Sequence, residues 1–212
     1  MGQVFDSMND DQKSAFTRKM ERLGLSATAL THSDELRTGA ARPGPTILSS
    51  DPDESHLPPT IVEVRDVAHF KELSGVPDAH YESRKYSDVA FDYPQPLDER
   101  RAKIVADSRN QCDLEYQLTD AELGDVRKAA HAYVMGNSAK VQSHEPVINA
   151  MLFPTRMAVF AGESIVVTKD NPLIIQGPNP VVLNYASIKV EDGGQIIVKV
   201  TADVNAQTFI QQ

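Results

Sequence analysis

The sequence predicts an α+β protein, with a helical N-terminal and middle region, an extended arm, and a C-terminal all-β domain. Up to about residue 145, apolar residues recur at helical spacing between capping residues and glycines. After Pro146, short apolar triplets alternate with Gly, Pro, Asn and Asp, a pattern typical of short strands joined by tight turns. We therefore expect three segments: an N-terminal helix and Pro-rich arm (1–60), a mainly helical region (61–145) and a β-rich domain with a 23-residue repeat (146–212).

The first predicted helix lies in NDDQKSAFTRKMERLGLS (9–26). Asn9 is a suitable N-cap, two aspartates follow at the positive end of the helix, and Gly24 ends it. One apolar stripe (Phe16, Met20 and Leu23) is too little to hold so short a helix by itself. We expect the stripe to dock on its own domain or on a neighbouring subunit; the alternative is a partly frayed terminal helix.

The segment 36–60 reads LRTGAARPGPTILSSDPDESHLPPT. Five of the 13 prolines of the chain fall here, among turn-forming residues and few large apolar ones. This composition predicts an extended arm or linker outside the core, ordered by lying along another surface. Deleting residues 1–60 is then expected to weaken assembly without unfolding the β-rich domain.

The middle region contains one short predicted strand and several predicted helices. TIVEV (60–64) alternates like a strand, RDVAHFKELSG (65–75) has a helical apolar face that ends at Gly75, and a further helix is predicted in 97–111. The strongest helical pattern is TDAELGDVRKAAHAYVMGN (119–137), which opens with the capping box of Thr119 and Glu122. Gly136 stands where a left-handed helix end is expected.

Two stretches of the β-rich domain repeat each other. SIVVTKDNPLII (164–175) aligns without a gap on SIKVEDGGQIIV (187–198), so that Ser164 falls on Ser187 in a 23-residue repeat. Aliphatic residues fall on aliphatic residues, as Ile165 does on Ile188, and polar turn falls on polar turn. This match of strands and turns indicates structural repetition.

The spacing of the strands predicts coils. Strand starts are expected near residues 157, 165, 173, 181, 188, 196 and 206, so that three short strands make up about one repeat. This is the arrangement of a β-solenoid, in which equivalent strands of successive coils pair. The stretch LNYASIKVEDGGQIIV (183–198) resembles the rung pattern of right-handed β-helices, which implies an architecture and no particular family. An antiparallel sandwich or jelly roll, with short strands at similar intervals, is the alternative.

Composition narrows the range of partners. The net charge of −9 makes phosphate backbones and anionic membranes poor partners, so neither nucleic acid nor a lipid surface is expected. No apolar run of membrane-spanning or signal-peptide length occurs. We expect a cytoplasmic protein, or one exported without a cleaved signal peptide.

Candidate chemistry is sparse in this sequence. No two of the six histidines sit at metal-ligand spacing. His69 and Glu72 would share one face of a helix, and that pair needs a further ligand from elsewhere. Cys112, the single cysteine, would need a histidine beside it to act as a nucleophile, and His131 is expected on a solvated helix face. The acids of the repeat, Asp170, Glu191 and Asp192, fall in predicted turns. The sequence therefore assigns no catalytic residue, metal or cofactor.

The leading hypothesis from the sequence is a non-enzymatic, self-associating structural or protein-interaction protein. The sequence ends within a predicted strand, AQTFIQQ (206–212), and an open β edge calls for a cover. Its expected partner is the protein itself, in a homo-oligomer or larger assembly formed through the arm and the β edge. The alternatives are a carbohydrate-active enzyme or carbohydrate-binding module on a β scaffold, and a secreted effector or toxin component.

Overall fold

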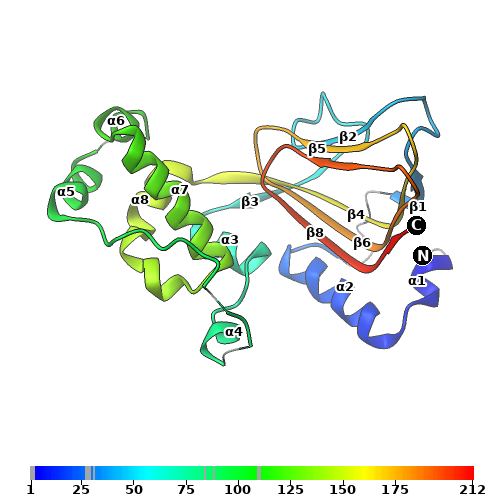
Figure 1. Ribbon diagram of the computed structural model, residues 1–212, viewed down its shortest axis with the longest axis horizontal. Coiled ribbons are helices and arrows are strands. Elements are labelled where there is room, and N and C mark those ends of the chain that lie inside the picture. Colours follow the sequence, from blue (N-terminus) through cyan, green and yellow to red (C-terminus); the bar gives the residue numbers. More distant parts are fainter. Residues whose placement is uncertain (1–2, 27–29, 31, 84, 88, 109–110) are drawn as a thin grey trace. The chain divides into compact units, whose positions relative to one another are not determined.

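The computed structural model describes residues 3–26, 30, 32–83, 85–87, 89–108 and 111–212 of the chain. The protein is α+β, as the sequence predicts, with helices and two parallel sheets. It forms two units: the β unit, residues 1–63 and 156–212, and the helical unit, residues 64–155 (Figure 1). These units divide the chain differently from the three predicted segments, because the N-terminal residues belong with the C-terminal strands.

Two sheets make up the β unit, and the strand pairs β1–β4, β4–β6, β6–β8, β2–β5 and β5–β7 are all parallel. The larger has the strand order β1-β4-β6-β8 with β3 also beside β4, and the smaller has the order β2-β5-β7. The strands of the larger sheet are β1 (His32–Arg37), β3 (Thr60–Val64), β4 (Thr155–Val167), β6 (Val181–Val190) and β8 (Ala202–Gln211). Those of the smaller sheet are β2 (Thr46–Ser49), β5 (Leu173–Gln176) and β7 (Ile196–Val198). In Figure 1, β4, β6 and β8 run side by side, as their pairing requires.

Strand pairing follows the 23-residue repeat of the sequence. Ile165 lies opposite Ile188 in the β4–β6 pair, and Leu173 lies opposite Ile196 in the β5–β7 pair, as the gapless alignment of the two copies places them. In the next pair, β6 with β8, Ile188 lies opposite Phe209. Equivalent residues therefore stack in columns across successive strands, and the apolar residues of the inward-facing columns, such as Ile165 and Ile188, form the core between the sheets.

Each turn of the β unit has two strands where the sequence predicted three. The expected starts at 157 and 165 lie in one strand, β4, and those at 181 and 188 lie in one strand, β6. Gly162 and Ser164 lie between the two expected starts in β4, but no Gly-Pro or Asn-Gly turn interrupts the strand. Its 13 residues run from Thr155 to Val167, 11 of them are buried, and its pairing with β6 passes over only Glu163 and Ala186. The strand therefore continues through the expected break.

The prediction of an arm outside the core over 36–60 is wrong. Residues Thr46–Ser49 form β2, which pairs in parallel with β5, and Leu48 is fully buried in the core between the sheets. The five prolines flank this four-residue strand and never interrupt it. Four strand residues contribute little to the composition of the whole segment, so the prolines and turn-forming residues around them made it resemble a linker.

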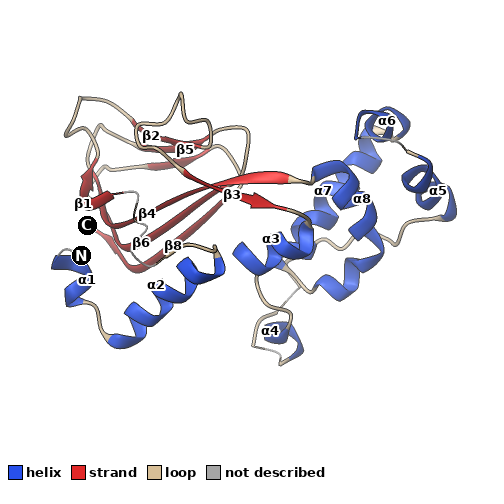
Figure 2. Ribbon diagram, turned by 180° about the vertical axis from the view of Figure 1, so that it is seen from behind, coloured by secondary structure: helices blue, strands red, loops and turns tan. Residues whose placement is uncertain are grey.

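The N-terminal helix docks on its own unit. After the short α1 (Gln3–Ser7), α2 (Asp10–Arg22) begins at the capping box of Asn9 and Gln12. The predicted stripe is buried: Phe16 and Met20 pack with Ala161 of β4 and Ala186 of β6, on the outer face of the larger sheet (Figure 2). Gly24, with a φ of 69°, ends the helix as expected.

The helical unit consists of one 3₁₀ and six α-helices among the described residues. They are α3 (Val67–Ser74), α4 (Ala79–Glu82), α5 (Glu99–Asp107), α6 (Gln111–Gln117), α7 (Asp120–Met135), η1 (Ser138–His144) and α8 (Glu145–Leu152). The predicted strand (60–64) and the helices before Gly75, within 97–111 and after Thr119 are confirmed. Buried residues of α7, α8 and η1, with Val67 and Leu114, form a separate core.

The helix after Thr119 ends differently from the prediction. Gly136 has an extended backbone (φ −107°, ψ −160°), not the left-handed one expected. The ammonium group of Lys71 donates to the carbonyl oxygens of Tyr133 and Gly136, each at 2.8 Å, and so satisfies carbonyls that a left-handed turn would otherwise cap. Glycine is required here for space, because a Cβ would lie 2.7 Å from the backbone carbonyl oxygen of Ala132.

The first apolar triplet after Pro146, VIN (147–149), which the pattern of short apolar triplets predicts as a strand, lies in a helix. Pro146 occupies the first turn of α8, where a missing N–H costs nothing, and Val147, Ile148 and Met151 are buried at helical spacing. Three consecutive apolar-rich residues do not distinguish a strand from a buried helix, and the sequence pattern alone favoured the wrong one.

Candidate interaction surface at the end of the β unit

Three columns of inward side chains in the β unit end in exposed residues. In each column the inner members, from earlier coils, are fully buried, whereas the last member, on β7 or β8, is exposed. The columns are Phe160–Leu183–Val204, Ile165–Ile188–Phe209 and Leu48–Ile175–Val198. The last members are 41% exposed at Val204, 58% at Phe209 and 50% at Val198. We call these three residues the end face; they expose the core at the β7–β8 end.

The strands that carry the end face are edge strands. Within the described residues, β8 is the last strand of its sheet and β7 the last of the other, and neither pairs on its outer side (Figure 1). Edge strands are usually guarded by charges or prolines. β8 contains no proline and one charged residue, Asp203, whose carboxylate lies 2.5 Å from the ammonium nitrogen of Lys19. The outer edge of β8 is therefore unguarded.

Hydrogen bonds with β6 and with helix α2 hold β8 in place. Asn205 of β8 donates from Nδ2 to Oδ1 of the fully buried Asn184 on β6, at 2.9 Å, and Asn184 lies within 3.4 Å of the carbonyl oxygen of Phe16. Gln12 reaches the carbonyl oxygen of Gln207 at 3.3 Å. These contacts hold β8 in register, so the end face is part of an ordered strand.

The opposite end of the core is closed. Leu57 packs against the core that contains the fully buried Leu48. The loop that carries it satisfies the outer edge of β2: the His56 amide donates to the Ile47 carbonyl oxygen at 2.9 Å, and the Ser49 amide to the Ser55 hydroxyl at 3.1 Å. The two ends of the core therefore differ, one being capped by its own chain and the other open.

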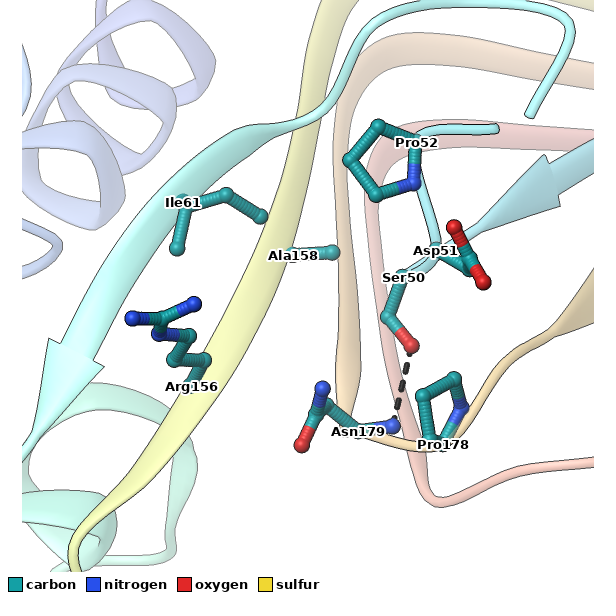
Figure 3. A pocket seen from close by; sticks show the side chains of 8 residues that line it. All are labelled: Ser50, Asp51, Pro52, Ile61, Arg156, Ala158, Pro178 and Asn179. Atoms are coloured by element: carbon teal, nitrogen blue, oxygen red, sulfur yellow. Dashed lines mark hydrogen bonds between the residues drawn. The ribbon is translucent and has the colours of Figure 1, made fainter. Parts of the chain in front are cut away.

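A shallow cavity also lies in the β unit (Figure 3). It measures about 250 Å³ and is lined by Ser50, Asp51, Pro52, Ile61, Arg156, Ala158, Pro178 and Asn179. Its polar groups serve the fold: the Ser50 hydroxyl accepts from the Asn179 amide at 2.9 Å, and Arg156 pairs with Glu63 at 3.1 Å. None of these lining residues is aromatic, and the cavity is smaller than most ligand pockets.

The residues considered for chemistry from the sequence do not come together. His69 accepts from the Arg65 amide at 3.3 Å, and within the described part of the chain no three His, Cys, Asp or Glu side chains form a metal-binding group. Cys112 is exposed on α6, and His131 is exposed beside the ring of Phe91. The acids of the repeat lie in turns, where Glu191 pairs with Arg37 at 2.8 Å.

Buried charges of the helical unit have structural partners. Glu122 accepts from the Thr119 amide at 2.8 Å and binds Arg100 and Arg101 at 2.8 and 3.1 Å. The pKa of Glu122 is lowered to about 2, and the hydrogen bond from the Thr119 amide contributes more to this shift than any other donor. Since these groups cap α7 and join it to α5, the shifted pKa reflects helix capping.

The end-face residues could not be recognised from the two matching copies of the repeat. Phe209 could have been found by continuing the column of Ile165 and Ile188 past the second copy, but the spacing along the chain becomes shorter there. Only two copies share the 23-residue spacing, so a gapless alignment does not identify the third member of each column.

No helix in the described part of the chain is long and apolar enough to cross a membrane. Comparisons of the chain with protein-family models, with curated proteins and with solved structures found no match.

Proposed function

We propose that this protein is a non-enzymatic, self-associating protein whose β unit is a short β-helix-like solenoid and whose end face is the contact between copies. The observation that carries the proposal is the exposed end of an otherwise buried core, at Val198, Val204 and Phe209. Repeat folds bury their core by stacking, and an end without a polar cap needs a partner to do so.

The solenoid assignment is supported by parallel pairing. β4 with β6, β6 with β8, and β5 with β7 all pair in parallel, with equivalent residues of successive coils side by side. Sandwiches and jelly rolls are built from antiparallel strands joined by hairpins, which such pairing does not favour.

The energy available at the end face is moderate. Complete burial of a Val or Phe side chain gains roughly 1.5–3 kcal/mol, so each half-exposed residue has about 1 kcal/mol left to gain. Six such side chains in a pair of copies would gain about 6 kcal/mol, close to the lower range of the cost of association. Backbone pairing along the β8 edge must add to this, and we expect association to depend on concentration.

Light scattering coupled to size-exclusion chromatography tests the proposal across a range of protein concentrations. The unaltered chain should associate, and Phe209→Asp or Val204→Lys should yield monomers with an unchanged circular dichroism spectrum. Val89→Lys is the matched control for Val204→Lys, because Val89 is 89% exposed and belongs to the helical unit. A strictly monomeric chain at high concentration would overturn the proposal.

Carbohydrate binding has less support. Sugar sites rely on exposed aromatic platforms, and the cavity of the β unit is lined by small, aliphatic and charged residues. The end face offers one aromatic ring, Phe209, without polar groups among its three residues to orient hydroxyls.

A further inference from the structure

Resting on the proposed self-association, we infer that two copies meet end face to end face about a two-fold axis, with β8 of one copy beside β8 of the other. The assembly then closes at two copies. Three features of the β unit favour this arrangement: the two ends of its core differ, β8 carries less charge than β1, and the end face is complementary to itself.

The capped end of the core cannot receive the end face of another copy. Stacking head to tail would place β7 of one copy against the outer edge of β2 in the next. That edge is already occupied by the loop around His56, which donates to Ile47 and packs Leu57 on the core. A second copy would have to displace this loop, whereas no described segment covers the end face in the same way.

Charge also distinguishes β8 from β1, an edge strand at the other end of the larger sheet. The sequence of β1, HSDELR (32–37), carries three charged residues in six, of which Arg37 is paired with Glu191. β8, ADVNAQTFIQ (202–211), carries only Asp203 in ten residues, and Lys19 neutralises it. Charged edges discourage strand addition and uncharged edges permit it. β8 is thus the edge suited to pairing, and β1 is not.

The end face suits a second copy of itself. Its three residues are apolar, and the stretch 196–212 carries one positive and one negative charge in a chain whose net charge is −9. Two copies that meet here bring neutral surfaces together, although each chain as a whole is net negative. Apolar surface facing apolar surface leaves no charge buried without a partner.

Two-fold symmetry also gives the edge backbone its hydrogen bonds. When an edge strand meets its own symmetry copy, the two run antiparallel, so β8 and its copy would form a standard ladder and extend the larger sheet across the interface. An interface that uses the same patch on both copies closes as a dimer, whereas a head-to-tail contact repeats into a filament.

Single-cysteine cross-linking in a Cys112→Ser background tests the geometry. Gln207→Cys, Thr208→Cys and Ile210→Cys place one thiol at successive points along β8, and Glu35→Cys places one on the edge strand β1. Under mild oxidation, at least one β8 variant should form a covalent dimer with itself in most of its molecules. When a β8 variant is mixed with Glu35→Cys, the yield of mixed dimer should not exceed the background yield of covalent dimer that Glu35→Cys forms by itself.

Cross-linking and light scattering together separate the two proposals. A dimer by scattering, with β8 cross-linked to β8, supports both. Filaments, mixed β8–β1 cross-links, or a dimer in which no β8 thiol finds its copy would overturn the two-fold inference while self-association stands. A monomer at every concentration would overturn the proposed function itself, and the inference with it.

Discussion

Phe209 lies directly opposite Ile188 in the parallel pairing of β8 with β6, yet Ile188 is fully buried and Phe209 is 58% exposed. The difference arises from position: Ile188 has a strand on each side, and Phe209 has a described strand on one side only. Two residues of one column therefore differ in surroundings, and we assign the inner one to folding and the outer one to association.

Truncating the two residues should separate these roles. Ile188→Ala removes fully buried methylene groups and should lower the free energy of unfolding by about 2–5 kcal/mol at any protein concentration. Phe209→Ala should lower it by less than about 1 kcal/mol in dilute protein and by more at concentrations where copies associate. Urea unfolding at two protein concentrations measures both effects. A concentration-independent loss for Phe209→Ala would contradict the assigned role.

The asparagine pair should contribute to the stability of the last strand. Asn205→Ala removes the donor to Asn184 and leaves the side-chain oxygen of a fully buried amide without that bond. Leaving such a group unsatisfied costs about 1–3 kcal/mol. Hydrogen exchange of the β8 amides should accelerate in this variant. Asn179→Ala, a substitution in a turn of the same unit, is the control and should leave β8 protected.

Much of the secondary structure could be predicted because the signals were local. Asn9 and Thr119 begin their helices through capping boxes, which need only four residues to be recognised. The register of the β strands could also be predicted, since a gapless repeat fixes which residues stack. Ile165 and Ile188 were paired from the sequence and lie opposite one another.

What could not be predicted depends on contacts between distant segments. Whether Leu48 belongs to an arm or to the core is decided by β5, which lies far along the chain from it. The extended backbone of Gly136 is decided by Lys71 from another helix. The end face was missed for a similar reason, because exposure of Phe209 depends on which strands surround it and not on its own neighbours in the chain.

Glu122 should make the helical unit sensitive to strong acid. Its pKa is lowered to about 2 when folded, from an ordinary value of 4.5, so its stabilisation is complete above about pH 4.5 and is lost as the pH falls toward 2. Glu122→Gln keeps the shape but removes the charge that Arg100 and Arg101 bind, and should cost about 1–2 kcal/mol at pH 7. Urea unfolding of both proteins between pH 7 and 2 should show the difference narrowing in acid. Glu99→Gln, at an exposed position of α5, is the control.

His144 should make the same unit sensitive to mild acid. Its side chain is buried, no described group bonds its Nε2, and burial lowers the pKa of the imidazole below 6.5. The unfolded chain therefore takes up a proton near pH 6.5 that the folded chain resists, so stability is complete above this pH and declines below it. Between pH 7.5 and 5.5, His144→Leu should lose less stability than the unaltered protein, and His131→Gln, at an exposed site, should behave as unaltered. If the free energy of unfolding fell with pH at the same rate in the unaltered protein and in both variants, His144 would not take up a proton on unfolding.

Deleting residues 1–60 should unfold the β unit, contrary to what an arm outside the core would imply. The deletion removes Leu48 and the whole of β2, and with them one side of the column that continues through Ile175. It also removes Phe16 and Met20, which cover the outer face of the larger sheet at Ala161 and Ala186. The free energy lost with several fully buried side chains exceeds the free energy of unfolding of most domains, which is roughly 5–15 kcal/mol. Far-ultraviolet circular dichroism should show loss of the strand signal, with retention of the helical signal from residues 64–155.

A deletion limited to residues 1–8 is the matched control and should leave the strands folded, because it spares α2 and β2. If the longer deletion kept a cooperative β transition, the assignment of β2 to the core would be wrong.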